Sequence, residues 1–194
     1  MSRALHLDSN PLRPDFWVDI FANDHPVAIE IGPGFGEFLE FIATRQPDWN
    51  FFAVEHLSSR TRVIQRRIDA GNITNARALC AQAECVLAVL PDACVDRFHI
   101  QFPDPWWKRR HHRRRLMTAS LVAQLRRTLR PGATIEFITD VEEYFRLAFA
   151  LLEADPGLSH IGIPELPTTT SFSRKAEARG WQVFASTHRK NAGS

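Results

Sequence analysis

Short apolar runs alternate with segments of helical periodicity through most of this 194-residue chain, and that alternation restricts the folds open to it. Strands alternating with helices indicate an α/β fold, in which a mostly parallel seven-stranded sheet is covered by helices on both faces. The last two runs are separated by about 17 residues rather than by a long crossover helix, which favours an antiparallel C-terminal edge hairpin. The predicted strands are 26–31, 51–55, 75–80, 96–102, 133–139, 158–163 and 181–187, and the predicted helices are 37–46, 58–71, 83–90, 115–130 and 141–154.

Three local signals set the expected ends of these elements. Gly71 is predicted to end the helix 58–71 as a left-handed cap. Pro131-Gly132 predicts a turn before the fifth strand. Asp140 and Glu143 form a D-x-x-E pattern, which predicts a capping box for the helix 141–154.

The composition suits one compact domain spanning 1–194, because 44% hydrophobic residues can supply a core and only 24% are charged. No apolar run approaches the ~20 residues of a membrane span. Asp8, Pro11 and Pro14 interrupt the N-terminal segment before a signal-peptide core could form. The three cysteines are too few for a disulfide framework and lack zinc spacing, so we expect reduced core thiols, no metal and a cytoplasmic chain; they are Cys80, Cys85 and Cys94.

Positive charge is concentrated in one segment. Residues 108–115 read KRRHHRRR, and their six permanent charges, taken from the net charge of +2, leave a body of −4. Such asymmetry favours a polyanionic partner, most simply nucleic acid. A solvated charged loop is the alternative interpretation.

A glycine-rich segment lies between the first predicted strand and the first predicted helix. Glu30 ends the strand, and Gly32, Gly34 and Gly36 follow in a G-x-G-x-G pattern that lets the backbone approach a ligand closely. Glu55, at the end of the second strand, stands where a carboxylate accepts hydrogen bonds from the ribose hydroxyls of an adenosine cofactor. The alternative is a tight structural turn with a surface glutamate.

The segment F102-P-D-P-W-W-K108 follows the fourth predicted strand, where ligands bind in open parallel sheets. Pro103 and Pro105 restrict the backbone on either side of Asp104, so its carboxylate is held in a defined direction. Trp106 and Trp107 are candidates for stacking on a base or for core packing, and Lys108 and the arginines after it are candidates for phosphate contacts.

Two sets of motifs resemble known families. The E-x-G-x-G-x-G arrangement of 30–36 resembles the nucleotide loop of class I S-adenosylmethionine methyltransferases, which are Rossmann-like. FPDPWWK over 102–108 resembles the signature of tRNA (guanine-N7-)-methyltransferases. The stretch R113-R-R-L, the F-I-T-D ending at Asp140 and the T-S-F-S of 170–173 resemble further parts of that family's pattern, and the likeness runs from about residue 26 to 188.

The resemblance implies methyl transfer from S-adenosylmethionine to a guanine N7 in tRNA. It implies that Asp104 is the catalytic residue beside both cofactor and guanine, and that the basic segment 108–115 contacts tRNA. It implies a cofactor site made by Glu30, Gly32, Gly34, Gly36, Glu55, Gln82 and Asp104. It implies substrate contacts by Lys108, Arg109, Asp140, Thr170, Ser171, Phe172 and Ser173.

The chain departs from the family pattern at two positions. Gln82 stands where an acidic residue usually accepts from the adenine amino group, and its side-chain carbonyl can accept the same bond; a polar helix-start residue is the alternative reading. Ser173 stands where the family usually has glutamate. A non-catalytic RNA-binding relative, a methyltransferase acting on another nitrogen and a nicotinamide-dependent oxidoreductase therefore stay open as alternatives, as do a monomer and a homodimer.

Overall fold

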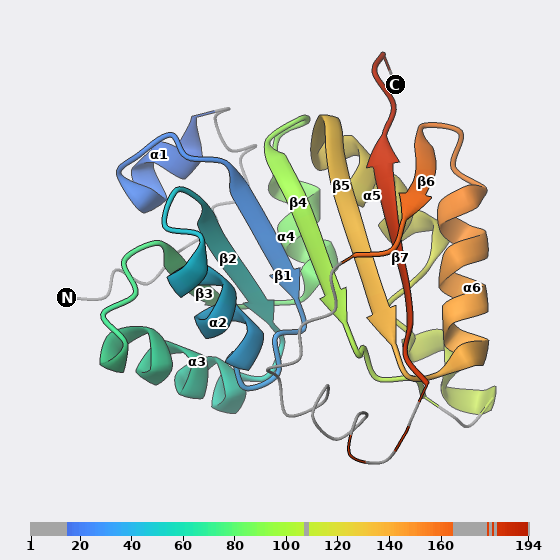
Figure 1. Ribbon diagram of the computed structural model, residues 1–194, viewed down its shortest axis with the longest axis horizontal. Helices are drawn as coiled ribbons and strands as arrows, with labels where there is room; N and C mark the ends of the chain where they lie inside the picture. The colour runs from blue at the N-terminus through green and yellow to red at the C-terminus, as the bar shows by residue number, and fades with distance from the viewer. Residues whose placement is uncertain (1–14, 107–108, 165–177, 179, 181, 194) are drawn as a thin grey trace.

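The computed structural model describes residues 15–106, 109–164, 178, 180 and 182–193, which form one seven-stranded sheet in the order β3-β2-β1-β4-β5-β7-β6 (Figure 1). The strands are β1 (Val27–Ile31), β2 (Asn50–Glu55), β3 (Ala76–Cys80), β4 (Val95–Gln101), β5 (Leu129–Thr139), β6 (Leu158–Gly162) and β7 (Phe184–Lys190). The helices are α1 (Phe16–Phe21), α2 (Glu37–Arg45), α3 (Ser58–Ala70), α4 (Ala83–Val89), the 3₁₀ helix η1 (Arg109–Arg114), α5 (Ala119–Thr128) and α6 (Glu142–Glu153).

The strand directions confirm the predicted fold class. β1 to β5 pair in parallel, whereas β7 is antiparallel both to β5 and to β6. β7 therefore lies inside the sheet, and β6 forms the outer edge of the C-terminal hairpin. Parallel strands place all their carboxyl ends at one edge of the sheet, where the loops that follow them meet.

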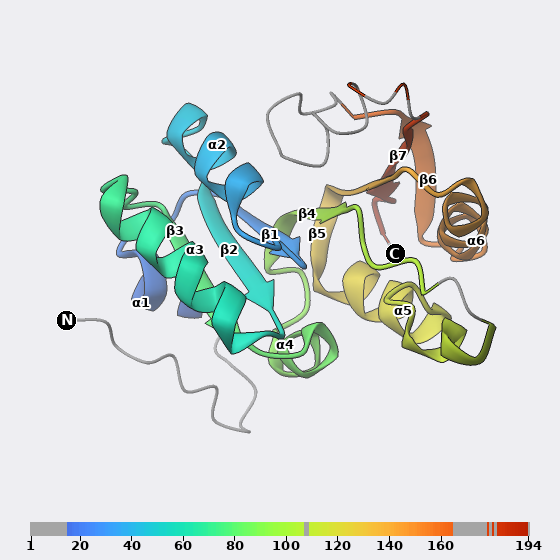
Figure 2. The same ribbon diagram turned by 90° about the horizontal axis from the view of Figure 1, so that it is seen from below.

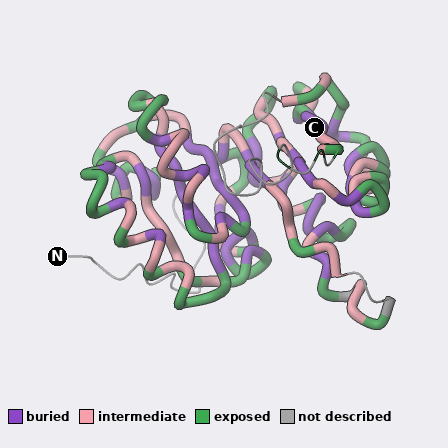
Figure 3. Tube along the Cα trace, turned by 60° about the horizontal axis from the view of Figure 1, so that its bottom comes forward, coloured by how far each residue is buried: buried purple, intermediate pink, exposed green. Residues whose placement is uncertain are grey.

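Helices cover both faces of the sheet. Ile64 and Ile68 of α3 pack with Leu39 and Ala43 of α2 over the β1–β3 part of one face, while α4, α5 and α6 contribute to the larger core on the other side. Figure 2 shows α2 on the opposite side of the sheet from α4 and α5. Buried residues follow the central strands in Figure 3. Because side chains alternate along a strand, Glu30 and Glu55 both point to the α2–α3 side.

The ends of two helices differ from the predictions. Gly71 has a φ of −83°, and Asn72 adopts the left-handed conformation with a φ of 48° instead. The Asn72 N–H donates to Asp69 and the Ile73 N–H donates to Ile68, so α3 ends in a Schellman motif one residue later than predicted. Likewise α5 begins at Ala119 rather than at 115, because the Thr118 hydroxyl accepts from the Leu121 N–H and caps it.

The capping box predicted for α6 is also wrong. Val141 occupies the N-cap position, and its N–H donates to the Thr139 hydroxyl. The Glu143 carboxylate does not return to the backbone, because it pairs with Arg115 at 2.9 Å. Asp140, which was predicted to cap the helix, precedes the N-cap residue.

Two further expectations are corrected. Pro131-Gly132 does not precede the fifth strand but lies within β5, which begins at Leu129 with a shift in register, and Gly132 takes a φ of 82° there. The three cysteines are free, but only Cys94 belongs to the core. Cys80 and Cys85 are exposed, because Cys80 ends the edge strand β3 and Cys85 lies on the outer side of α4.

Candidate active site

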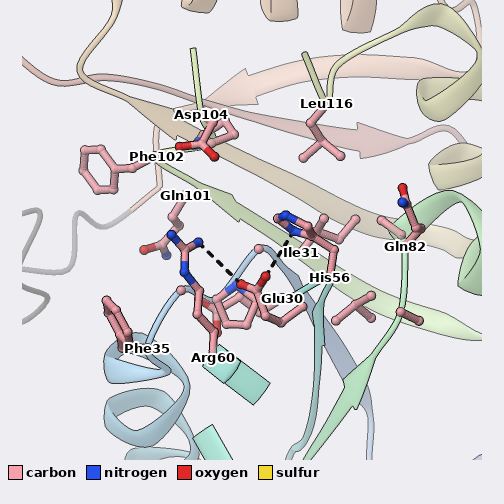
Figure 4. Close-up of a pocket in the computed structure, with 18 of the residues that line it drawn as sticks. Glu30, Ile31, Phe35, His56, Arg60, Gln82, Gln101, Phe102, Asp104 and Leu116 are labelled. Atoms are coloured by element: carbon pink, nitrogen blue, oxygen red, sulfur yellow. Dashed lines mark ion pairs between the residues drawn. The ribbon is translucent and has the colours of Figure 1, made fainter. Parts of the chain in front are cut away.

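A cavity of about 340 Å³ opens at the carboxyl ends of β1, β2 and β4, which is within the size range of small-molecule sites (Figure 4). Four segments line it: the end of β1 with the loop after it, the end of β2 with the start of α3, the start of α4, and the loop after β4. Segments that are distant in the sequence thus meet at one place, where the sequence predicted the cofactor and the catalytic aspartate.

The three glycines of the loop after β1 have different surroundings. All three have positive φ values, of 73° at Gly32, 60° at Gly34 and 77° at Gly36. Gly32 and Gly34 line the cavity, and a Cβ added to either would meet no atom within 4 Å. A Cβ on Gly36 would lie 3.0 Å from Ile64 of α3. Gly36 therefore allows α2 and α3 to pack closely and does not itself line the cavity.

Glu30 is a buried carboxylic acid at the floor of the cavity. Burial, reinforced by the nearby charge of Glu55, raises its pKa from 4.5 to about 8. Its Oε2 atom has no hydrogen-bond partner among the residues that the structure describes. A buried polar atom without a partner is costly, so this site favours a ligand that brings a donor or a positive charge.

Glu55 is 1% exposed and half satisfied. Its Oε1 accepts from the Leu57 N–H at 2.9 Å and lies 3.1 Å from His56 Nδ1. Its Oε2, 3.9 Å from the Arg60 guanidinium, accepts no hydrogen bond from the described part of the chain. This oxygen is available to a hydroxyl of a bound ligand, as the sequence predicted for a ribose.

Gln82 lies across the cavity from the loop after β4 (Figure 4). It is exposed and occupies the N-cap position of α4, but its side chain makes no capping hydrogen bond. Its amide is therefore not committed to the helix. The interpretation of Gln82 as only a helix-start residue does not account for that uncommitted side chain.

The backbone around Asp104 is strained. Phe102 and Trp106, which flank the Pro-Asp-Pro segment, have φ values of 47° and 46°, where residues other than glycine are rare. Such conformations cost of order 1–3 kcal/mol each and are concentrated at functional sites. The Phe102 N–H donates to the Ile138 carbonyl at 2.8 Å, which attaches this segment to β5. Asp104 is exposed and lines the cavity.

An aromatic and basic cluster continues the cavity wall beyond Asp104. Trp106 lines the cavity, and its ring stands edge-on to His111 with 5.8 Å between the ring centres. The Arg114 guanidinium lies 5.0 Å from the Trp106 ring centre and also lines the cavity. Trp106 is half-buried, so it serves as a wall of the site rather than as a core residue.

Arg115 corrects the prediction that all six cations of 108–115 face a polyanion. It is buried, with 7% exposure, and pairs with Glu143 of α6. A buried and paired guanidinium cannot meet a phosphate, so no more than five cations of this segment are available to RNA.

The remaining predicted residues have the following positions. Asp140 is half-buried just after β5 and is not among the residues that line the cavity. Arg109 begins η1, and its side chain lies outside the described part of the structure. Trp107, Lys108, Thr170, Ser171, Phe172 and Ser173 lie outside the described residues.

Sequence reasoning missed several residues of the cavity wall. Phe35, at the tip of the glycine loop, is 54% exposed, and the Arg60 guanidinium lies 5.6 Å from its ring centre. His56 and Arg60 follow the predicted Glu55 by one and five residues, so their place next to a ligand-binding strand end was the available signal. Arg114 was hidden within the basic run.

Two searches of the described residues found nothing. No helix there has the length and apolar character needed to cross a bilayer. No group of three or more His, Cys, Asp or Glu side chains there could hold a metal ion.

The sheet order and the position of the cavity are those of class I methyltransferases. The fold is similar to a crystal structure of the 16S rRNA methyltransferase KamB, with a TM-score of 0.68 and 18% identity over 91% of this chain and 93% of that one. It is also similar to a crystal structure of a SAM-dependent methyltransferase from Aquifex aeolicus, with a TM-score of 0.61 and 14% identity over 93% of this chain and 90% of that one.

Sequence relatives narrow the class. Residues 24–184 match the family model described as "Putative methyltransferase". The chain is 33% identical to the tRNA (guanine-N(7)-)-methyltransferase of Rhodopirellula baltica, over 89% of this chain and 69% of the relative. It is 34% identical to the enzyme of that name from Nitrosospira multiformis, over 90% and 79%. The chain belongs to the tRNA (guanine-N(7)-)-methyltransferase family.

Proposed function

We propose that this protein transfers a methyl group from S-adenosylmethionine to N7 of a guanine in tRNA, in the cytoplasm. The observation that carries the proposal is that Asp104, held between two strained residues, lines the same cavity as the paired carboxylates Glu30 and Glu55. The activity named for the relatives, which are about one-third identical over most of this chain, supports the choice of reaction and substrate.

The residues of the cavity fit the cofactor. The unpartnered oxygens of Glu30 and Glu55 call for donors or positive charge, and the cofactor offers an ammonium group, a sulfonium and two ribose hydroxyls. Gly32 and Gly34 leave open space where side chains would otherwise project, and the nine-residue helix α2 begins directly after the loop. We assign Glu55 to the ribose, Glu30 to the amino-acid portion and Gln82 to the adenine.

Asp104 serves the methyl acceptor. S-adenosylmethionine, when bound, supplies a methyl group already activated by its attachment to a positively charged sulfur. Guanine N7 carries an in-plane lone pair, so the protein need not remove a proton before attack, and its main tasks are alignment and electrostatics. In this proposal the Asp104 carboxylate accepts hydrogen bonds from the guanine N1–H and amino group, which orients the ring and stabilises the positive charge that develops on it.

The rest of the substrate meets the wall beyond Asp104. Trp106 and Arg114 offer an aromatic face and a guanidinium at the cavity, suited to a base and a phosphate. Lys108, Arg109 and Asp140 are further proposed substrate residues. Thr170, Ser171, Phe172 and Ser173 are proposed on the family resemblance alone.

The proposal is tested by incubating unmodified tRNA with the protein and S-adenosylmethionine and analysing the nucleosides by mass spectrometry. We expect 7-methylguanosine. A different methylated nucleoside would assign the enzyme another nitrogen, and binding of tRNA without any transfer would identify a non-catalytic relative. Either result would overturn the proposed reaction.

A second experiment tests the role of Asp104. Asp104→Asn keeps one acceptor oxygen but removes the negative charge, so we expect kcat to fall by about 10²-fold. Asp69→Asn, an exposed carboxylate on α3 paired only with Gln65 among the described contacts, is the matched control and should retain wild-type turnover. An Asp104→Asn enzyme as fast as the wild type would show that another group performs this task.

A further inference from the structure

Arg115 is the last residue of the basic run, yet its guanidinium is directed into the protein. Nε donates to the Pro105 carbonyl at 2.9 Å, and Nη2 donates to Glu143 Oε1 at 2.9 Å. Nη2 also lies 3.1 Å from His112 Nε2, which must be the acceptor there because arginine has only donors. Two of the three guanidinium nitrogens are therefore committed to partners within the chain.

Packing around Arg115 completes its enclosure. Its guanidinium carbon lies 5.3 Å from the centre of the Tyr144 ring, and the Tyr144 hydroxyl accepts from the Met117 N–H at 3.1 Å. Tyr144 is fully buried on α6, two turns of chain away from the run of charges only in space and 29 residues away in sequence. Arg115 thus joins the segment after β4 to the first turn of α6.

The partner of Arg115 in the segment after β4 is directly next to Asp104. The Phe102 N–H bond to Ile138 attaches the start of the Pro-Asp-Pro segment to β5, and the bond from Arg115 to Pro105 attaches its end. Phe102 and Trp106, outside these two attachments, both have left-handed backbone conformations that would relax if either attachment were lost.

We propose that Arg115 is a positioning residue, which fixes the direction of the Asp104 carboxylate through the Pro105 carbonyl and is itself held by Glu143. The inference rests on the proposed function and deepens it, because it separates one arginine of the basic segment from those that bind RNA. The requirement is for a planar fork that reaches two acceptors at once, which a lysine ammonium does not reproduce. Glu143 is 68% exposed, so its charge is screened and its contribution is smaller than that of Arg115.

The test compares Arg115→Lys and Arg115→Met with Arg110→Met, a neighbouring exposed arginine of the same run. Single-turnover methyl transfer at saturating tRNA should fall by about 10-fold in Arg115→Lys and about 10²-fold in Arg115→Met, since small displacements of an aligned group have effects of that size. The slope of log K for tRNA against log salt should stay at the wild-type value in both. In Arg110→Met it should become shallower by about 0.7 to 0.9, the contribution of one phosphate contact.

Two results would overturn the inference. One is a shallower salt slope in Arg115→Lys, which would make Arg115 a phosphate ligand. The other is a wild-type single-turnover rate in Arg115→Lys. Should Arg115→Met fail to fold, the lysine variant alone decides between these outcomes.

A measurement without substrate separates this inference from the proposed reaction. Hydrogen–deuterium exchange of the ligand-free protein should be faster at the amides of Asp104 and Trp106 in Arg115→Lys than in the wild type, and unchanged in β1 and β2. Unchanged exchange at those two amides would refute the positioning role even in an active enzyme. If the wild type shows no methyl transfer, the proposed function fails, whereas the exchange result still decides whether Arg115 holds the segment.

Discussion

The ionisation of Glu30 should make the ligand-free protein less stable as the pH rises. In the unfolded chain this carboxyl has an ordinary pKa near 4.5, whereas in the folded protein burial raises the pKa to about 8. Below pH 4.5 the group is protonated in both states and destabilises neither. Between these two values folding requires a proton to be taken up, and above about pH 8 the folded protein contains a buried charge. Stability is therefore lost as the pH rises through this window.

The size of the effect follows from the same two values. At about 1.4 kcal/mol per pH unit, the full window corresponds to roughly 5 kcal/mol, of which roughly 3 kcal/mol is lost between pH 5 and pH 8. Glu30→Gln removes the titration. An amide without a partner adds a cost that is the same at every pH, so it shifts the stability curve without tilting it.

Urea denaturation of the ligand-free protein between pH 5 and pH 8.5 measures this difference. The stability of the wild type relative to Glu30→Gln should fall by about 3 kcal/mol across that range. Glu84→Gln, which changes an exposed glutamate of the same cavity, should keep the wild-type pH dependence. If the wild-type and Glu30→Gln curves run parallel, the carboxyl is not buried as described and the reasoning fails.

Two further predictions follow from the geometry. Gly36→Ala should reduce the free energy of unfolding by about 2–4 kcal/mol, because the methyl group is forced against α3 in a left-handed backbone; Gly132→Ala, with a similar φ and open space, should lose only about 1–2 kcal/mol, and equal losses in urea denaturation would disprove the packing contribution. The affinity for tRNA should depend on salt with a slope no steeper than about −3.5 to −4.5, because Arg115 leaves five cations in 108–114; a slope near zero would show that the segment does not face RNA.

The sequence was sufficient to predict the parts of the site that depend on local order. Glu30, the glycine loop and Glu55 each follow a parallel strand directly, and parallel strands bring their carboxyl ends to one edge, so their meeting could be inferred. Asp104 follows by the same reasoning from the end of β4. The antiparallel position of β7 was predicted from the shortness of the last connection, and the observed pairing confirms it.

The parts that could not be predicted depend on contacts between distant segments. The D-x-x-E pattern at Asp140 and Glu143 is a good capping box by itself, but Glu143 is drawn to an arginine 28 residues earlier. Arg115 looked like one more solvated cation, because nothing in the run KRRHHRRR shows that Tyr144 encloses its last member. Gly71 and Asn72 are both able to end a helix, and the hydrogen bonds of the turn decided between them.

The place of β7 in the sheet has a consequence for how the molecule is made. Residues 184–190 fill the gap between β5 and β6, so during synthesis β6 emerges with no neighbour to pair with until those later residues have left the ribosome. Until then β5 has an unpaired border open to other chains, of the kind that promotes aggregation. Nascent chains arrested before residue 184 should accordingly need chaperones more than the finished protein does.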